Sequence, residues 1–278
     1  MELSQDAWRK FAASLTKSEL AAWIAEFERI HSRQRLWAYY PDEGPLRREL
    51  YDKHTEFFAA GSRHNERAYI GGNRVGKTHC VSYEATLHML GEYPAWWVGR
   101  RFERPVTAWL AGEDAKAVRE SLQEKVLGPP GQFGTGLVPG DKLVEVKPRS
   151  GIPDAIDTFS VKHRSGRISR GMFKSYEQGR ESFQAAKVDV MVFDEEPEMA
   201  IYTEGLTRTM STVPGEESGI VMCSFTPLKG ISATVLQFLP GGAMPATEEL
   251  RKQAWGWSIT LALTIVPFYA ILCHGYSI

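Results

Sequence analysis

The stretch from Gly71 to Thr78, GGNRVGKT, fits the phosphate-loop pattern G-x-x-x-x-G-K-[ST] at every fixed position. A loop that wraps a polyphosphate turns several backbone N–H groups inward, and glycine at positions 71 and 76 leaves room for that approach. Residues 66–70 (ERAYI) are predicted to form a strand entering the loop, and residues 78–90 (THCVSYEATLHML) a helix leaving it. The alternative is a glycine-rich surface turn, and the flanking strand and helix favour the phosphate loop.

The loop is expected to hold a nucleotide. Backbone N–H groups at the start of the helix, with the positive end of its dipole, favour an anion there. Lys77 is expected to reach the β- and γ-phosphates, and the hydroxyl of Thr78 to bind Mg²⁺. The predicted nucleotide-binding residues are Gly71, Gly72, Asn73, Arg74, Val75, Gly76, Lys77 and Thr78.

A second stretch, residues 187–197 (KVDVMVFDEEP), predicts the catalytic carboxylates. Its apolar run is typical of a strand buried on both faces, and ligands bind at the carboxyl ends of such strands. Consecutive carboxylates there repel one another unless they are hydrated or meet a cation, which Mg²⁺ provides. We therefore expect Asp194 to bind the metal and Glu195 to take a proton from the attacking water. These residues together indicate an ATP hydrolase.

The order of predicted elements indicates an α/β fold. Residues 105–112 form a predicted strand followed by a helix over residues 113–127, an alternation typical of a parallel sheet covered by helices. Residues 128–151 are expected to be irregular, with one short strand at 143–146. Another apolar strand, residues 220–225, ends in Ser224, Phe225 and Thr226 before Pro227. Its hydroxyls either hold a water near the γ-phosphate or simply lead the chain out of the sheet.

Composition sets broad limits. The chain has 278 residues, with 43% hydrophobic and 24% charged residues, as in an ordinary soluble domain. The net charge of −1 gives no overall field for a nucleic acid, so any such contact must come from a local patch. The three cysteines are widely separated, which argues against a zinc site and a disulfide framework and favours a reducing compartment. The N-terminus lacks the apolar run of a secretory signal.

The first 60 residues are predicted to be helical. Thr16 to Glu19 has the form of a capping box, and apolar residues from Leu20 to Ile30 recur at helical spacing. That stripe predicts either packing or a partner-binding helix. A second helix is expected over residues 46–60, and its Phe57 and Phe58 either pack in the core or supply a face for adenine.

A basic cluster is predicted on a hairpin formed by residues 157–163 and 168–176. Such a cluster is either a solvated surface or a surface that contacts DNA phosphates. The candidate DNA-contacting residues are Lys162, Arg164, Arg167, Arg170 and Lys174.

Five segments in order resemble the ATPase half of the large terminase subunit, the DNA-packaging motor of tailed bacteriophages. They are HTEFFAAG, GGNRVGKT, FKSYEQGRESFQ, VMVFDEEP and SFTPLKG, between residues 54 and 230. The resemblance implies a RecA-like P-loop ATPase fold of the additional-strand, catalytic-glutamate (ASCE) type, with a central, mainly parallel sheet. It also implies ATP and Mg²⁺ as cofactors, Arg74 as a phosphate-sensing arginine and Glu195 as the catalytic base. Ser224, Phe225 and Thr226 are similar to the coupling motif that links loss of the γ-phosphate to movement of a DNA-gripping part.

The resemblance further implies partners. Double-stranded DNA, the portal protein and the small terminase subunit are expected, with the active form a homo-oligomeric ring in the host bacterial cytoplasm. An arginine from a neighbouring subunit is expected to complete each site, and Arg180 is a candidate for it. No stable membrane association is expected.

The predicted organisation is a helical segment over residues 1–60, a P-loop ATPase domain over 61–240 and an atypical tail over 241–278. Large terminases carry a nuclease domain after the ATPase, and nuclease activity is not expected from this tail. Residues 255–273 are apolar and free of charge, so a membrane span, a docked core segment and a truncated or frameshifted tail all compete. The alternative functions are accordingly a remnant that only binds nucleotide and a membrane-tethered P-loop ATPase.

Overall fold

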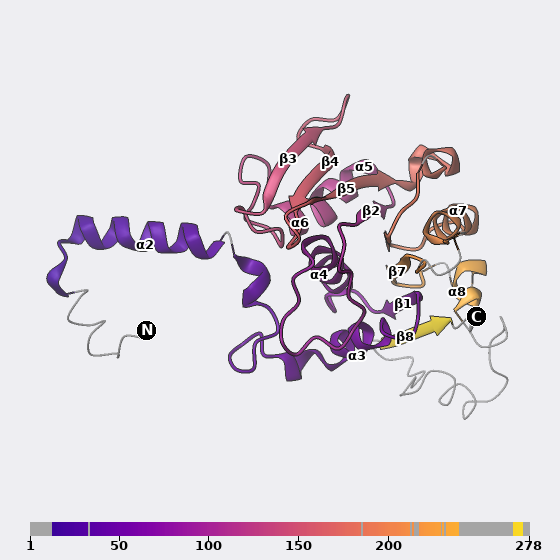
Figure 1. Cartoon of the computed structure of the whole chain (residues 1–278), viewed down its shortest axis with the longest axis horizontal. Coiled ribbons are helices and arrows are strands. Elements are labelled where there is room, and N and C mark those ends of the chain that lie inside the picture. Colours follow the sequence, from indigo (N-terminus) through magenta and orange to yellow (C-terminus); the bar gives the residue numbers. More distant parts are fainter. Residues whose placement is uncertain are drawn as a thin grey trace.

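A computed structural model describes residues 13–32, 34–184, 186–211, 213, 217–228, 230, 232–238 and 269–274. Over these ranges the chain forms an α/β fold around an eight-stranded sheet, with helices on both sides (Figure 1). The strand order is β3-β4-β5-β2-β6-β7-β1-β8. The predicted α/β class is confirmed, and so is the expected additional strand, because β7 lies between the loop strand β1 and the acidic strand β6.

The predicted strands all form, within one or two residues at their ends. They are β1 (Glu66–Gly71), β2 (Thr107–Gly112), β3 (Leu143–Pro148), β4 (Ile156–Lys162), β5 (Ile168–Ser175), β6 (Val190–Asp194) and β7 (Ile220–Phe225). Strand β8 (Tyr269–His274) was not predicted. Strands β5, β2, β6, β7 and β1 run parallel to their neighbours in that series, whereas β3, β4 and β8 pair antiparallel.

Helices pack against both faces of the sheet. The longer helices are α2 (Lys17–Ser32), α3 (Asp52–Ala60), α4 (Lys77–Leu90) and α7 (Met199–Thr209). The shorter ones are η1 (Arg35–Ala38), η2 (Arg48–Tyr51), α5 (Ala115–Val118), η3 (Arg119–Gln123), α6 (Glu124–Leu127), η4 (Tyr176–Gln178), η5 (Arg180–Phe183) and α8 (Ala233–Gln237). The helix expected over residues 113–127 is thus continued through a π-helical turn, η3.

The hydrophobic core has two parts, one on each side of the sheet. On one side Phe58 of α3 and Tyr83 of α4 pack with Val192 of β6. On the other side Tyr202 of α7 packs with Phe193 of β6. Strand β6 is buried along its whole length, which explains its unbroken apolar sequence. Because the parallel strands end at one edge, residues that follow β1, β6 and β7 meet there.

A buried ion pair ties β1 to α4. The guanidinium of Arg67 donates to both carboxylate oxygens of Glu84, at 2.7 and 3.0 Å, and to the carbonyl oxygen of Phe57 at 2.6 Å. Both charged side chains are fully buried. His88 lies 3.2 Å from the same carboxylate, one turn along α4. The strand that leads into the loop is therefore fixed to the helix that leaves it.

The helices predicted for the N-terminal region are confirmed in part. The capping box forms, since Glu19 accepts from the backbone N–H of Thr16 at 2.9 Å and Thr16 accepts from that of Glu19 at 3.3 Å. Trp23 and Ile24 of α2 are exposed, so the packing expected of the apolar stripe does not hold for them. The second helix, α3, begins at Asp52 rather than at residue 46, after the short turn η2. Leu36 and Tyr40 lie in the same core as α4.

The apolar segment at residues 255–273 is described only in part. Residues 255–268 lie outside the described ranges, and β8 pairs antiparallel with β1. Among the helices of the described ranges, none has the length and apolar character that a membrane crossing requires.

Candidate functional site

The predicted phosphate loop, between β1 and α4, contains two residues in an uncommon backbone conformation. Gly76 has φ +80° and Arg74 φ +65°, both in the left-handed region. A Cβ at Gly76 would lie 2.9 Å from the ring of His54, so glycine is required there by conformation and by space. Gly71 ends β1, and α4 starts at Lys77, as predicted.

Lys77 lies inside the loop. Its Nζ donates to the carbonyl oxygen of Gly72 and to the hydroxyl of Thr226, each at 2.8 Å. Burial lowers the pKa of Lys77, and the carboxylates of Glu195 and Asp194 act against that shift. The predicted phosphate-binding lysine is thus held at the sheet edge beside the end of β7.

Thr78 and Asp194 meet across the site. The Thr78 hydroxyl donates to Oδ1 of Asp194 at 2.9 Å, and the Ser224 hydroxyl donates to the same oxygen at 2.7 Å. The Ser121 hydroxyl lies 3.5 Å from the second carboxylate oxygen. Burial raises the pKa of Asp194, although these hydroxyls favour the ionised form. The two residues expected to bind a metal therefore lie together.

Glu195 follows in a strained backbone conformation. Its φ is +65°, which is uncommon for a residue other than glycine. Its N–H donates to the carbonyl oxygen of Ser224 at 2.8 Å, and the Tyr176 hydroxyl lies 3.0 and 2.9 Å from the carbonyl oxygens of Asp194 and Glu195. Desolvation raises the pKa of Glu195, and the adjacent Asp194 carboxylate raises it further. A carboxyl with a raised pKa in this position suits a proton acceptor near neutral pH.

The end of β7 contributes two hydroxyls to the site. Besides accepting from Lys77, the Thr226 hydroxyl lies 2.9 Å from the carbonyl oxygen of Gly71 and 2.9 Å from Oδ1 of Asn73. With Ser224 on Asp194, this strand end contacts both the loop and the acidic strand. Phe225 differs, because its side chain is buried in the core and makes no polar contact.

The third carboxylate, Glu196, does not join a metal cluster. Its side chain is 9% exposed, and one of its oxygens has no hydrogen-bond partner in the described chain. Within the described ranges, no group of three or more histidine, cysteine or acidic residues is placed to hold a metal. Among the oxygen donors next to the loop, the Thr78 hydroxyl and the Asp194 carboxylate are in direct contact.

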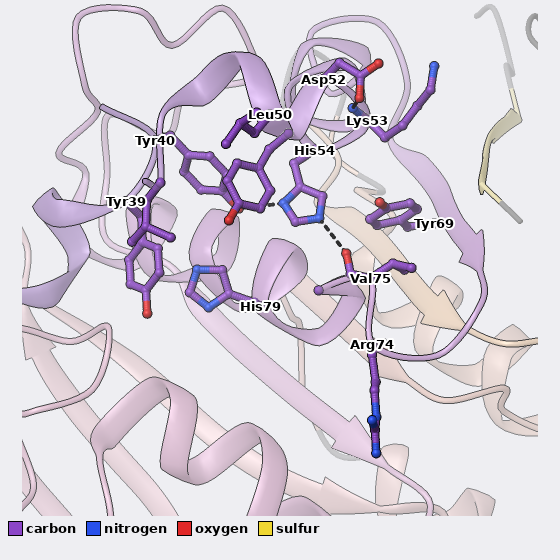
Figure 2. Close-up of a pocket in the computed structure, with 13 residues that line it drawn as sticks. Tyr39, Tyr40, Leu50, Asp52, Lys53, His54, Tyr69, Arg74, Val75 and His79 are labelled. Atoms are coloured by element: carbon purple, nitrogen blue, oxygen red, sulfur yellow. Dashed lines mark hydrogen bonds between the residues drawn. The ribbon is translucent and has the colours of Figure 1, made fainter. Parts of the chain in front are cut away.

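An aromatic pocket of about 620 Å³ opens beside the loop (Figure 2). Tyr39 packs against His79, with ring centroids 4.1 Å apart, and the side chain of Arg74 extends away from the rings. Burial lowers the pKa of His79 to about 3, so its imidazole is neutral. The other lining residues are Tyr40, Leu46, Leu50, Tyr51, Asp52, Lys53, His54, Tyr69, Val75 and Gly76.

His54 connects this pocket to the loop. Its Nε2 lies 3.1 Å from the carbonyl oxygen of Val75, and its Nδ1 lies 2.8 Å from the Tyr40 hydroxyl. A carbonyl oxygen only accepts, so Nε2 carries the proton and Nδ1 accepts from Tyr40. The adenine face suggested for Phe57 and Phe58 is wrong, because both side chains are almost completely buried in the core.

The basic hairpin is only partly as predicted. Lys162, Arg164, Arg167 and Arg170 are exposed, and Arg164 is paired with Glu103. Lys174 is 7% exposed and donates to the carbonyl oxygen of Ser182 at 2.6 Å. Its ammonium also lies over the Trp109 ring, 4.3 Å from the centroid. The DNA contact suggested for Lys174 is therefore wrong, because other elements cover its charge.

Some residues at the site were not singled out from the sequence. Tyr176 and Ser121 reach the acidic strand end, and Tyr39 and His79 line the pocket. Tyr176 lies inside the segment FKSYEQGRESFQ, which was the available signal for it. Arg180 from the same segment pairs with Glu204 at 3.0 Å and is more than half exposed.

Comparison with known proteins identifies the family. Residues 68–261 match the family described as "Terminase large subunit, T4likevirus-type, N-terminal". The chain is 31% identical over 241 residues to the large terminase subunit of Salmonella phage P22, which covers 80% of this chain and 46% of that protein. The chain therefore spans about half the length of this curated relative.

Solved structures of two other phage proteins are similar at low identity. The large terminase ATPase domain of Thermus phage P74-26 is 16% identical with a TM-score of 0.44, over 76% of this chain and 75% of that chain. The large terminase of the thermophilic bacteriophage D6E is 13% identical with a TM-score of 0.43, over 63% of this chain and 38% of that chain. The family match takes in most of the sequence, and the chain therefore belongs to the terminase large subunit family, in its N-terminal part.

Proposed function

We propose that this chain hydrolyses ATP. The observation that carries the proposal is the meeting of three segments at one sheet edge, where Lys77 lies in the loop and Thr78 contacts Asp194 across the site. A loop with inward N–H groups, a lysine and a hydroxyl–carboxylate pair is the arrangement that phosphoryl transfer requires. The proposed ATPase unit spans residues 61–240, and the segment from Leu36 to Ala60 packs into its core.

The donor set fits Mg²⁺. This ion prefers oxygen ligands and keeps several waters, so one hydroxyl and one carboxylate beside a polyphosphate are sufficient protein ligands. In the proposed site Thr78 and Asp194 hold the ion, which would neutralise charge that develops on the phosphate oxygens. The backbone N–H groups of the loop and Lys77 orient the phosphates, and Arg74 is proposed to contact them from the same loop.

Glu195 is the proposed general base. Its carboxyl follows the metal-binding strand directly, and its raised pKa increases its affinity for a proton taken from water. The Tyr176 hydroxyl and the Ser224 carbonyl hold the Glu195 backbone, so they position the carboxylate without touching the reacting atoms.

The aromatic pocket beside the loop is the proposed site of the adenine base. It adjoins residues 74–76, and its volume is within the usual range for small-ligand sites. Tyr39 and His79 offer ring faces, and neutral His79 brings no charge that would have to be desolvated.

We further propose that hydrolysis powers translocation of double-stranded viral DNA into a procapsid. Family membership supports this proposal, together with its implied partners: the portal protein, the small terminase subunit and further copies of the chain in a ring. Ser224 and Thr226 are the proposed coupling residues, since they join the acidic strand to the loop lysine and would lose those contacts when phosphates bind.

The test is Mg²⁺-dependent ATP hydrolysis by the purified chain, with and without double-stranded DNA, and with Lys77→Ala as the blank. Hydrolysis that rises with DNA is expected. ATP binding by Lys77→Ala at wild-type affinity would contradict the loop assignment. Nucleotide binding by the wild-type chain without hydrolysis would contradict the motor function and favour a chain that only binds nucleotide.

A further inference from the structure

One face of strands β3, β4 and β5 is open to solvent on the side away from α4. A cavity of about 720 Å³ lies on it and extends to β2. Ile168 and Val144, at its rim, are 42% and 56% exposed. We call this surface the open face. It is distinct from the nucleotide site, which is built on residues that follow β1, β6 and β7.

The strand register decides which side chains lie on the open face. Residues directly opposite each other on neighbouring strands share a face of the sheet. Ser160 is opposite Arg170, and Lys162 is opposite Ile168. The intervening residues of β4 and β5 point the other way, where they contribute Phe159, Val161 and Phe173 to the core. The open face therefore carries the polar half of an alternating pattern.

Hydroxyl groups and cations form rows across this face. Arg170 is opposite Ser160 on one side and Thr107 of β2 on the other. Lys147 of β3 is opposite Thr158 of β4. Arg170 and Lys147 thus each have a neutral hydroxyl beside them on the next strand, at the spacing of about 4.8 Å between strands. Lys162 is opposite Ile168 instead, and Ser160 is also opposite Glu145.

The cations of the open face differ in their partners, because Lys147 pairs with Glu145 at 3.6 Å whereas Lys162 and Arg170 lie apart from carboxylates. Within the described ranges, the side chains of Lys162 and Arg170 form no hydrogen bond and no ion pair. By contrast, Arg164 at the nearby turn pairs with Glu103, and Lys142 pairs with Glu92. The charged residues that line the cavity are Glu145, Lys147, Arg170, Lys174 and Lys187. Lys174 is covered and Lys147 is paired, so Lys162 and Arg170 carry the excess positive charge of this face in a chain with a net charge of −1.

This chemistry fits the backbone of a nucleic acid. Phosphate oxygens accept from lysine, arginine and hydroxyl side chains without regard to sequence. Proteins that bind single strands offer exposed aromatic rings on which bases stack. Here Trp109 is 3% exposed, and Phe159 and Phe173 belong to the core on the opposite face. A surface with phosphate ligands and no stacking platform favours a duplex.

We propose that the phosphate backbone of double-stranded DNA binds the open face, with Lys162 and Arg170 as its principal cation ligands. The inference rests on the proposed function for the identity of the nucleic acid. It divides the basic hairpin into two parts, because Arg164 and Arg167 lie at the β4–β5 turn and not on the open face.

The test compares two pairs of substitutions in the same hairpin of the full chain. The face pair is Lys162→Gln with Arg170→Gln, and the turn pair is Arg164→Gln with Arg167→Gln, so both remove two positive charges. Affinity for a short duplex of mixed sequence is measured by fluorescence anisotropy at several salt concentrations. Thermal unfolding of both variants serves as the control for folding.

The face pair is expected to weaken duplex binding by about tenfold at low salt and to reduce the slope of log K against log salt by about two. The turn pair is expected to change both values much less. An unchanged slope for the face pair, an equal effect of both pairs, or tighter binding of a single strand than of the duplex would overturn the inference.

Two further readouts separate this inference from its alternatives. The apolar rim would also suit a second copy of the chain, so sedimentation is measured for each variant. If the face pair alters self-association and leaves duplex affinity unchanged, the DNA assignment is wrong. ATP hydrolysis without DNA is measured in parallel. If the chain hydrolyses ATP but the face pair leaves duplex affinity unchanged, only this inference is refuted. If the face pair weakens duplex binding but the chain does not hydrolyse ATP, only the proposed function is refuted.

Discussion

The Tyr176 hydroxyl lies 2.9 Å from the backbone carbonyl oxygen of Glu195, and the bond spans two segments that are separate in the sequence. Glu195 has a positive φ, a conformation that costs energy for any residue other than glycine and persists only where its surroundings impose it. Tyr176 therefore helps to fix the direction in which the Glu195 carboxylate leaves the strand.

Tyr176→Phe is expected to lower kcat for ATP hydrolysis by about two- to tenfold, since the lost hydrogen bond is worth about 0.5–1.5 kcal/mol. The dissociation constant for Mg-ATP should stay the same, because Tyr176 contacts neither loop nor pocket. Steady-state kinetics and calorimetric binding check both values. Tyr202→Phe is the matched control, because it removes a buried hydroxyl bonded to Glu66 at 2.6 Å, away from the site. A parallel loss of ATP affinity in Tyr176→Phe would contradict the positioning role.

Glu195→Gln is expected to bind ATP normally and to hydrolyse it about 10²–10⁴ times more slowly, because the amide accepts no proton. Single-turnover hydrolysis measures the chemical step. Glu196→Gln is the control, since it changes the neighbouring carboxyl, which is 9% exposed. If Glu196→Gln slows turnover and Glu195→Gln does not, the base is Glu196.

Asp194→Asn is expected to stabilise the chain without ligand or Mg²⁺ while abolishing Mg²⁺-dependent hydrolysis. Burial raises the pKa of Asp194 in the folded state. The stability that this group contributes is therefore fully present below its unfolded pKa and is lost as pH rises through the folded pKa. Asparagine has no such loss and still accepts from Thr78 and Ser224 through Oδ1.

Urea unfolding of Asp194→Asn and the wild-type chain, measured from acid to neutral pH, checks this expectation. The two free energies of unfolding should agree most closely at acid pH. The variant should gain relative to the wild type as pH rises and then reach a constant difference. A variant that is less stable than the wild type at neutral pH would show that the ionised carboxylate stabilises the folded chain when Mg²⁺ and nucleotide are left out of the solution.

Glu84→Gln is expected to lower the free energy of unfolding by about 3–5 kcal/mol, because it leaves the Arg67 guanidinium buried without a counter-charge. Glu56→Gln is the control: Glu56 pairs with Lys53 at 2.9 Å on the exposed side of α3, where such a pair is worth about 0–1 kcal/mol. Denaturant titration of both variants distinguishes them. Equal losses would mean that the Arg67–Glu84 pair is not the tie between β1 and α4.

The strand ends that form the proposed site could be predicted from the sequence because their signals are local. A fully buried strand such as β6 needs an unbroken apolar run, so the first carboxylate after it marks the sheet edge. The sequence signal for the loop is also local, because Gly76 has a positive φ and this conformation favours glycine at that position. The hydroxyls of Ser224 and Thr226, at the end of β7, were predicted as candidates. Only the structure shows that Ser224 contacts Asp194 and that Thr226 contacts Lys77.

The aromatic pocket and the burial of Lys174 could not be predicted from local sequence signals. Tyr39 and His79 meet only because the segment after α2 packs against the start of α4, a contact that neither stretch encodes alone. Lys174 has the same place in the strand alternation as Arg170, yet Trp109 and the Ser182 carbonyl cover it from other elements. Contacts of this kind depend on tertiary packing, and the periodicity of the sequence does not reveal them.

The Ser224 and Thr226 hydroxyls, at the end of β7, are hydrogen-bond partners of two oppositely charged groups. In the described chain, neither Lys77 nor Asp194 forms an ion pair. The Lys77 ammonium donates a hydrogen bond to the Thr226 hydroxyl, and the Asp194 carboxylate accepts hydrogen bonds from Ser224 and Thr78. An incoming anion and an incoming cation therefore displace only neutral partners, and no internal salt bridge has to be broken first. The electrostatic attraction of Lys77 for anions and of Asp194 for cations is therefore available to ligands of opposite charge.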